Sequence, residues 1–465
     1  MLRFGSLFTI LSLALAACAD DPAVEGPDAG DTTPDGDTTP TPTTFTVHVD
    51  NVAPWTVLKN GVPTTKVGGG GGALGPGEAY DVTLTAGKGQ AFSFASMLGE
   101  SNDWFFGPGP AGIPLYDGDG NPVSGDVTAQ VQLWNAGTEI DQEPGVGADV
   151  GPNQSAPDAG AADPDPTVRA IPVTTTLSDG SSFTRPAIAD MIRVTVTPGA
   201  NRAFTIRIEN VSTATTLVTS QGTRSVHLSP PAWALHIKPA PLFDEGQPDR
   251  GQGLELIAES GRAGTLTTVL GALAGYATPI SPGVWTVHRG REPLFAVGVA
   301  DPGRGLEHQA EDGNPTSLAE TMTSALGSDI IDTGVFDTVV GGTDPGPAFA
   351  GHGYEVEVTA VPGDHLSFVT MFGMSNDWFF GTGPEGIALF DADGTPIDGD
   401  VTSDLAIYDA GTELDQELAV GPDTAPQQAG PDTGAADPID QVRQVPASRY
   451  GVPASAHLRV TVTPQ

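Results

Sequence analysis

Acidic side chains gather in two short stretches that are alike in sequence and could hold a metal ion. The stretch "DAGTELDQE" (409–417) places four carboxylates within nine residues, and "NAGTEIDQE" (135–143) repeats it with one carboxylate fewer. Carboxylates this close repel one another unless a cation lies between them or they point apart into water. Ca²⁺ takes six to eight oxygen ligands, many of them loop carboxylates. The pattern therefore favours calcium sites, with solvated acidic loops as the alternative.

An aromatic motif accompanies each acidic stretch. The sequence "SNDWFFG" occurs identically at 101–107 and at 375–381. Three adjacent aromatic residues cannot all face one side of a strand. We therefore expect them mainly in the core, with the remainder covering a loop or forming a contact surface.

Two other repeated patterns have structural interpretations. "YDGDGNP" (116–122) and "FDADGTP" (390–396) begin like EF-hand loops but lack a Glu twelve residues after the first Asp, so their Asp-Gly pairs predict hairpin turns. A Trp and a His recur at the same spacing in two further segments. We expect these to be packed strands with a hydrogen-bonded histidine, rather than metal or catalytic sites. The residues are Trp233, His236, Trp285 and His288.

Catalytic motifs are missing from the sequence. It has no Gly-x-Ser-x-Gly elbow, no His-Glu-x-x-His pair and no phosphate-binding loop, and it has a single cysteine. We therefore predict that the protein is not an enzyme. One alternative is a secreted hydrolase that acts through paired carboxylates. Another is a purely structural surface spacer.

The charge balance excludes one class of partner. The 465 residues include 19 Lys and Arg against 58 Asp and Glu, a net charge of −39. A chain this acidic is repelled by nucleic acid, so we predict no nucleic-acid partner. The excess fits a soluble secreted surface and also suits divalent cations.

The N-terminus resembles a bacterial lipoprotein signal. Arg3 precedes a short apolar run and "LAAC", which ends at Cys18, the single cysteine. We predict a signal peptide at 1–17 and lipidation of Cys18, with an ordinary secretory peptide as the alternative. Residues 18–44 are rich in Asp, Thr and Pro and predict a disordered tether.

Internal repeats indicate two copies of one mainly β domain. "FTVHVDNV" (45–52) and "FTIRIENV" (204–211) alternate apolar and polar residues, and "IRVTVTP" (192–198) matches "LRVTVTP" (458–464). We place domain 1 at 45–198 and domain 2 at 204–464. "SPPAWALH" and "SPGVWTVH" lie 52 residues apart and predict a tandem duplication at about 229–327 inside domain 2, with short helices at 254–275 and 306–327.

The repeats resemble the bacterial form of the spondin domain, the N-terminal module of the extracellular-matrix proteins F-spondin and mindin. The resemblance is carried by "SNDWFFG", by "LYD…NAGTE" and "LFD…YDAGTE", and by "SPGVWTVH…LF…GLE…AEDGNP". It covers both predicted domains. It implies two antiparallel β-sandwiches, a role in adhesion or matrix binding, and calcium bound by loop carboxylates.

The resemblance also implies which residues hold the ion. In the second copy they are Asp377, Asp409 and Glu413, and in the first copy they are Asp103, Asn135 and Glu139. Asn135 is an amide where the family has a carboxylate, and each lost charge weakens calcium binding. We therefore expect the first site to be weaker than the second, or empty.

Taken together, these features predict an adhesion or binding protein of the bacterial cell envelope. We expect it to be secreted across the inner membrane, anchored to the outer membrane only through its N-terminal lipid, and stiffened by calcium. The expected partner is an extracellular protein or polysaccharide. Two linked copies gain avidity toward repeated epitopes, which favours a binding role over a spacer.

Overall fold

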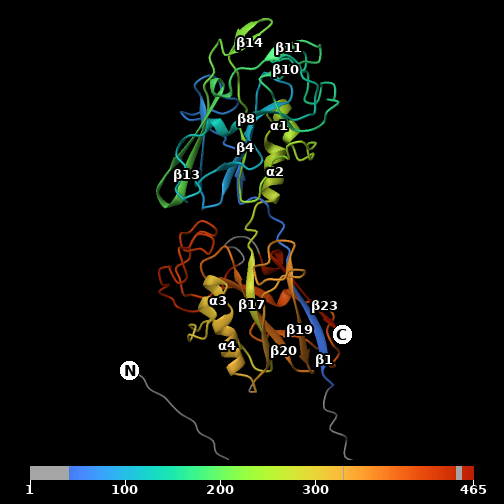
Figure 1. Ribbon diagram of the computed structural model, residues 1–465, viewed down its shortest axis with the longest axis vertical. Helices are drawn as coiled ribbons and strands as arrows, with labels where there is room; N and C mark the ends of the chain where they lie inside the picture. Colours follow the sequence, from blue (N-terminus) through green and yellow to red (C-terminus); the bar gives the residue numbers. More distant parts are fainter. Residues whose placement is uncertain (1–40, 328, 447–452) are drawn as a thin grey trace, which may run out of the picture. The chain divides into compact units, whose positions relative to one another are not determined.

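The computed structural model describes residues 41–327, 329–446 and 453–465. The predicted signal peptide, Cys18 and nearly all of the predicted tether lie outside this part of the chain, and residues 43 and 44 of the tether already belong to the first strand. Residues 42–465 form one compact unit. Its described residues are mainly β, with antiparallel pairing throughout the sheets and four short α-helices, which confirms the predicted fold class (Figure 1). No helix in the described ranges is long and apolar enough to span a membrane.

One group of sheets, here called the inner set, uses strands between residues 59 and 236. A four-stranded sheet has the order β3-β13-β12-β7, and a larger sheet has the order β2-β16-β4-β5-β8-β9 with β6 beside β4. Helices α1 and α2 belong to the same set. The bounds are β2 Lys59–Gly61, β3 Ala79–Thr85, β4 Ala91–Met97, β5 Trp104–Pro108, β6 Ile113–Pro114, β7 Gly125–Asp126, β8 Val131–Asn135, β9 Arg169–Ala170, β12 Ile192–Pro198, β13 Ala203–Asn210, β16 Ala232–His236, α1 Leu254–Ser260 and α2 Gly264–Ala272. Two small hairpins complete it, β10 Thr174–Thr176 with β11 Ser182–Thr184, and β14 Leu217–Thr219 with β15 Gly222–Arg224.

The second group, here called the outer set, repeats this arrangement. Its sheets have the orders β19-β1-β26-β23 and β18-β17-β20-β21-β24-β25, with β22 beside β20. Each strand has a counterpart at the same place in the inner set. The bounds are β1 Thr43–Asn51, β17 Ile280–His288, α3 Leu306–Asp312, α4 Thr316–Ser324, β18 Ile330–Phe336, β19 Gly353–Ala360, β20 His365–Phe372, β21 Trp378–Thr382, β22 Ile387–Ala388, β23 Gly399–Asp400, β24 Leu405–Asp409, β25 Arg443–Gln444 and β26 Leu458–Pro464.

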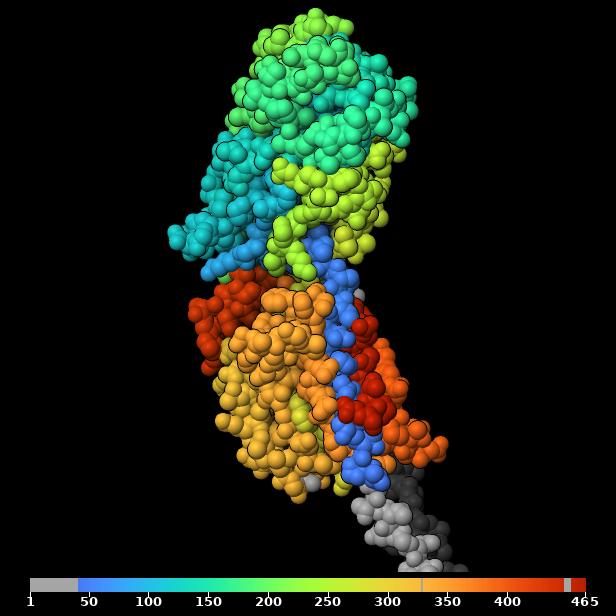
Figure 2. All heavy atoms as spheres, turned by 45° about the vertical axis from the view of Figure 1, so that its right-hand side comes forward, coloured from blue at the N-terminus to red at the C-terminus, as the bar shows by residue number. Residues whose placement is uncertain are grey.

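The strand pairing shows that the predicted domain boundaries are wrong. β1, predicted to open domain 1, pairs with β19 and β26 of the outer set, and Figure 2 shows its blue residues beside the orange and red ones of the C-terminal part. β13, predicted to open domain 2, pairs with β12 and β3. Only residues 199–202 separate β12 from β13, and such a short connection favours a hairpin. The predicted boundary therefore falls inside a hairpin.

The order of elements along the chain explains this mismatch. The inner set is inserted between β1 and β17 of the outer set, and it is a circular permutation of the outer set, because it begins at the counterpart of β18 and ends at the counterpart of α4. The predicted tandem duplication inside one domain is therefore also wrong. Its first copy packs with the inner set and its second copy with the outer set.

The larger sheet of each set is apolar on both faces. One face shares a core with the four-stranded sheet, and the other packs against the two helices. Trp104 and Phe106 enter the first core, whereas Phe105 enters the second. The aromatic motif is thus buried in alternation along β5, and its copy on β21 does the same, so the predicted core role is confirmed. That the two sets are β-sandwich domains of the spondin type stays a prediction.

The two sets also contact each other directly. The Glu417 carboxylate of the outer set accepts hydrogen bonds from Lys59 Nζ at 2.5 Å and from Thr85 Oγ1 at 2.7 Å. Arg202 donates to the carbonyl of Val420 at 2.7 Å. These contacts involve the outer acidic loop just after Glu413.

Candidate metal centres

The residues of "SNDW" form a turn that fixes the acidic loop beside it. Ser101 Oγ donates to the carbonyl of Leu98 at 2.7 Å and accepts from the backbone N–H of Trp104 at 3.0 Å, which closes the turn between β4 and β5. Asn102 Nδ2 donates to the carbonyl of Ile140, and Trp104 Nε1 donates to Asp141 Oδ1 at 2.6 Å. Ser375, Asn376 and Trp378 make the same contacts in the outer set. The identical sequence therefore serves an identical local structure.

The aspartate of this turn binds the start of the acidic stretch. Asp103 Oδ2 accepts from the backbone N–H groups of Thr138 and Glu139, both at 3.2 Å. In the outer set Asp377 Oδ2 accepts from Thr412 and Glu413 at 3.1 Å each. Each aspartate thereby holds the following glutamate beside its own carboxylate.

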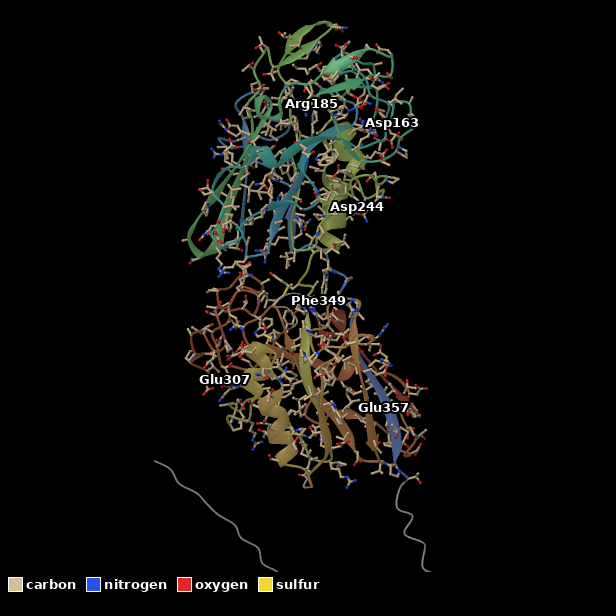
Figure 3. All side chains as sticks on the ribbon, in the orientation of Figure 1. Asp163, Arg185, Asp244, Glu307, Phe349 and Glu357 are labelled. Carbon is tan, nitrogen blue, oxygen red and sulfur yellow. The ribbon has the colours of Figure 1, made fainter. Side chains whose placement is uncertain are left out.

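A helix brings a further carboxylate to the same place. In the inner set, ligand oxygens of Glu139, Asp158 and Glu259 lie within 4.8 Å of one another, and Glu259 comes from α1. In the outer set ligand oxygens of Glu307, Glu311 and Asp432 lie within 4.8 Å of one another, and α3 supplies both glutamates (Figure 3 labels Glu307). Sheet, loop and helix therefore converge on one point in each set.

We define the inner acidic cluster as Asp103, Glu139, Asp158 and Glu259, and the outer acidic cluster as Asp377, Glu413, Asp432 and Glu311. The two clusters have the same residue types at equivalent positions. The first three members are related by the 274-residue offset of the repeated motif, and the helix glutamates by the offset of 52.

Each cluster contains three buried oxygens that lack a hydrogen-bond partner among the described residues. They are Asp103 Oδ1, Glu139 Oε2 and Glu259 Oε1 in the inner cluster, and Asp377 Oδ1, Glu413 Oε2 and Glu311 Oε1 in the outer cluster. A buried carboxylate oxygen without a donor is costly unless a cation satisfies it. The same three atoms are left in both sets, so the arrangement suits a bound divalent cation.

Glycines permit the close approach of the loops in both clusters. The N–H of Gly160 donates to Glu139 Oε1 at 2.7 Å, and a Cβ at this glycine would lie 2.5 Å from the Glu139 carboxylate. Gly434 has the same relation to Glu413. Only a residue without a side chain fits there.

Burial disfavours the charged form of these carboxylates when no cation is present. It raises the pKa of Glu259 to about 7 and that of Glu311 to about 8, and the nearby carboxylates Glu139 and Glu413 add to the respective shifts. For the same main reason the pKa values of Asp103 and Asp377 lie well above their ordinary value. Groups with such shifts are frequent at functional sites.

The predicted ligands are brought together, but not all of them face the unpaired oxygens. Asp377 lies beside both Glu413 and Asp409. The two oxygens of Asp409 are already engaged, one by the N–H of Gly411 at 2.7 Å and the other by Arg443 at 2.6 Å. The guanidinium of Arg443 thus supplies the positive charge at the group of Asp377, Asp409 and Asp415.

Asn135 takes the place of Asp409 in the inner set without leaving a gap. Its side chain accepts from the N–H of Gly137 and donates to Asp141 Oδ1 at 2.8 Å. The amide at position 135 therefore does not remove a ligand from the inner acidic cluster. The expectation that the outer site binds calcium more tightly than the inner site now rests only on the charge of Asp409. Arg443 offsets that charge.

Sequence reasoning missed the helix glutamates and the two loop aspartates. Glu259 and Glu311 lie in "AES" and "AED", 52 residues apart within the predicted duplication at about 229–327. The signal that could have found them is that an acid recurs there, as it does at Asp158 and Asp432. Both aspartates also adopt a left-handed backbone, with φ of 55° and 54°.

The other predicted patterns have structural roles. His236 contacts Ser93 Oγ at 2.9 Å and the carbonyl of Lys238 at 2.7 Å, and His288 is bonded in the same way. Both are buried and hydrogen-bonded, as expected. Asp117 Oδ1 accepts from the N–H groups of Asp119 and Asn121, so "YDGDGNP" is a turn. The equivalent bonds of Asp391 confirm the second turn.

Comparison with known proteins gives no assignment, since no family model matches the chain and no curated protein matches it significantly.

Proposed function

We propose that this protein is a calcium-binding adhesion protein of the cell envelope, with one ion in each acidic cluster. The observation that carries the proposal is the set of three partnerless buried carboxylate oxygens, repeated atom for atom in the two sets. Unpaired buried charge is strongly destabilising. Two sets that share this feature at equivalent positions point to a common ligand.

The chemistry of the ligand atoms favours calcium. The two clusters offer only carboxylate oxygens, without a histidine or a cysteine. Ca²⁺ prefers such hard oxygen ligands and tolerates irregular geometry, whereas Zn²⁺ favours nitrogen and sulfur. The exposed members Asp158 and Asp432 leave room for water in the coordination shell.

The bound ion would join elements that are distant in the chain. In the outer set it would link α3, the turn before β21 and the loop after β24. The same loop carries Glu417, which contacts the inner set. Calcium would thereby stiffen the loops of each set. Adhesion itself, the lipid anchor at Cys18 and an extracellular protein or polysaccharide partner belong to the same proposal and rest on the resemblance and on the N-terminal sequence.

Calorimetric titration of the full chain with CaCl₂ after chelator treatment tests the metal proposal. We expect two ions per chain, one ion in Glu311→Gln or Glu259→Gln, and none when both are changed. Asp409→Asn is the matched control, because it removes a carboxylate beside the cluster and introduces the residue found at position 135. This variant should retain both ions. Loss of binding in Asp409→Asn with retention in Glu311→Gln would show that the ion lies elsewhere.

A further inference from the structure

A cavity of about 650 Å³ lies among the segments that connect the two sets. Its walls come from residues 55–58, the connection back at 275–282, the end of β20 and the loop before β19. Apolar side chains dominate the walls, among them Trp55, Ile237, Pro279, Phe349, Met371 and Met374.

Two of these apolar side chains are unusually exposed. Phe349, labelled in Figure 3, is 58% exposed, and Ile237 is 49% exposed. Met371 and Met374 are buried at the wall, and methionine side chains adapt readily to an apolar ligand. Ligand cavities typically measure about 300–1,000 Å³ and are mostly apolar with a few polar groups that orient the ligand. This cavity fits that description.

Two charged side chains line the cavity, Lys238 after β16 and Asp312 at the end of α3. Lys238 lines both the cavity and a neighbouring polar hollow of about 430 Å³, which Arg459 also lines. Arg459 pairs with Asp50 at 3.4 Å, whereas Lys238 makes no ion pair within the described ranges. Cations are scarce in this chain, with 19 Lys and Arg against 58 acids, so Lys238 without an ion pair favours an anionic group beside it.

We propose that this cavity binds an amphiphile with a hydrocarbon chain and an anionic head group. The hydrocarbon chain occupies the apolar cavity, and the head group lies in the polar hollow beside Lys238. The ligand class is shared by free fatty acids and by anionic membrane lipids. No residue of the two acidic clusters lines this cavity, although Asp312, next to Glu311 on α3, does.

Displacement of a fluorescent fatty acid tests the proposal. A dansyl-labelled fatty acid is bound to the purified full chain and displaced with palmitate or with hexadecanol, which has the same chain length but no charge. In Lys238→Glu we expect palmitate to bind about tenfold more weakly or worse, with hexadecanol unaffected. Ala277→Phe places a ring in the cavity and should weaken both ligands.

A matched control separates the head-group effect from the general charge of the chain. Arg262 is an exposed cation that lines neither hollow, so Arg262→Glu should leave both affinities unchanged. The melting temperature of each variant checks that it has folded. Absence of probe binding to the wild-type chain would overturn the proposal. Probe binding that neither Lys238→Glu nor Ala277→Phe weakens would overturn it equally.

A second experiment distinguishes a membrane lipid from a free fatty acid as the ligand. The chain is mixed with phosphatidylglycerol vesicles and, separately, with monomeric palmitate. Vesicle binding that is lost in Lys238→Glu without binding of palmitate identifies a membrane lipid as the ligand. The converse result identifies a free fatty acid.

Discussion

Three of the four carboxylates in each acidic cluster are held away from water, and this burial makes the metal-free protein sensitive to pH. Glu311 on α3 is buried against the loop after β24, and the acids Glu307 and Asp432 lie beside it. A cation would remove the repulsion that burial creates. The same residues should therefore govern both stability and metal affinity.

The first prediction concerns stability without metal. Burial raises the pKa of Glu311 from an unfolded value of 4.5 to about 8, so the folded state holds this proton more tightly than the unfolded state. The resulting stabilisation is complete below about pH 4.5 and is lost as the pH rises through about 8. Glu259 acts in the same direction up to about pH 7. Urea unfolding of the chelator-treated chain should show a free energy of unfolding that falls between pH 5.5 and 8.

Neutral variants provide the control for this pH dependence. The double variant Glu259→Gln, Glu311→Gln cannot ionise at either position, so its stability should fall less over the same pH range. At pH 8 it should be more stable than the wild-type chain without metal, by an amount on the order of several kcal/mol. If the free energy of unfolding depended on pH equally in the two proteins, burial of Glu259 and Glu311 would not cause the pH dependence.

The second prediction is that calcium binding releases protons near neutral pH. The ion needs charged carboxylates, and part of Glu259 and Glu311 is protonated there because of the raised pKa values. Affinity should therefore fall as the pH is lowered from 8 to 6. Titrations in two buffers of different ionisation enthalpy measure the protons released. Equal heats in both buffers at pH 7 would count against this coupling.

Among the structural elements, the "SNDW" turn determines how well the acidic loop is placed. In the outer set Trp378 Nε1 donates to Asp415 Oδ1 at 2.8 Å, and this bond joins the start of β21 to the loop after β24. The third prediction is that Trp378→Phe, which removes the donor and part of a buried ring, destabilises the chain by at least about 1–2 kcal/mol. It should also weaken calcium binding at the outer cluster by several-fold.

Trp285→Phe is a suitable comparison for this element. Trp285 is a buried residue of β17 in the same core, away from the acidic loop. Its replacement should lower stability without changing the calcium affinity of the outer cluster. Similar affinity losses in both variants would indicate a general loosening of the sheet.

The elements themselves could be predicted from the sequence, but their partners could not. Period-two alternation identified β1 and β13, and helical spacing identified the segments that form α1 to α4. Alternation marks a strand and its buried face without naming the neighbour. Because "FTVHVDNV" and "FTIRIENV" have nearly the same pattern, the sequence alone does not assign either strand to a set, and only the short 199–202 connection distinguishes them.

The candidate site was predictable to a similar extent. Asp103, Glu139, Asp377 and Glu413 were implied by the family resemblance, which the repeated motifs carry. The helix glutamates were missed because their contact with the loop joins positions more than 100 residues apart. Asp409 was included among the predicted ligands, because the sequence does not reveal that Arg443, 34 residues later, pairs with its carboxylate.

At the scale of the whole molecule, one set is inserted into the other through two adjacent connections. The N–H of Thr56 donates to the carbonyl of Leu273 at 3.1 Å, and that of Gly275 donates to Val57 at 2.9 Å. The ends of the inner set are therefore close together, a property that permits domain insertion and excision. This topology explains why β1 folds with the C-terminal part of the chain.

The fourth prediction follows from this insertion. A chain in which residues 56–275 are replaced by a short Gly-Ser linker keeps every strand of the outer set, so it should fold cooperatively and bind one calcium ion. Residues 56–275 expressed alone should do the same. Circular dichroism and calorimetric titration measure folding and stoichiometry. By contrast, 45–198 and 204–464 expressed separately should not fold, since each lacks a central strand of its four-stranded sheet.

A crystal structure of the full chain grown with calcium tests the central claim most directly. We predict one ion in each set, with oxygens of Glu259 and Glu139, or of Glu311 and Glu413, at about 2.3–2.6 Å from it. Density for the ion between Asp377, Asp409 and Asp415 instead, or no density in either cluster at saturating calcium, would contradict the account.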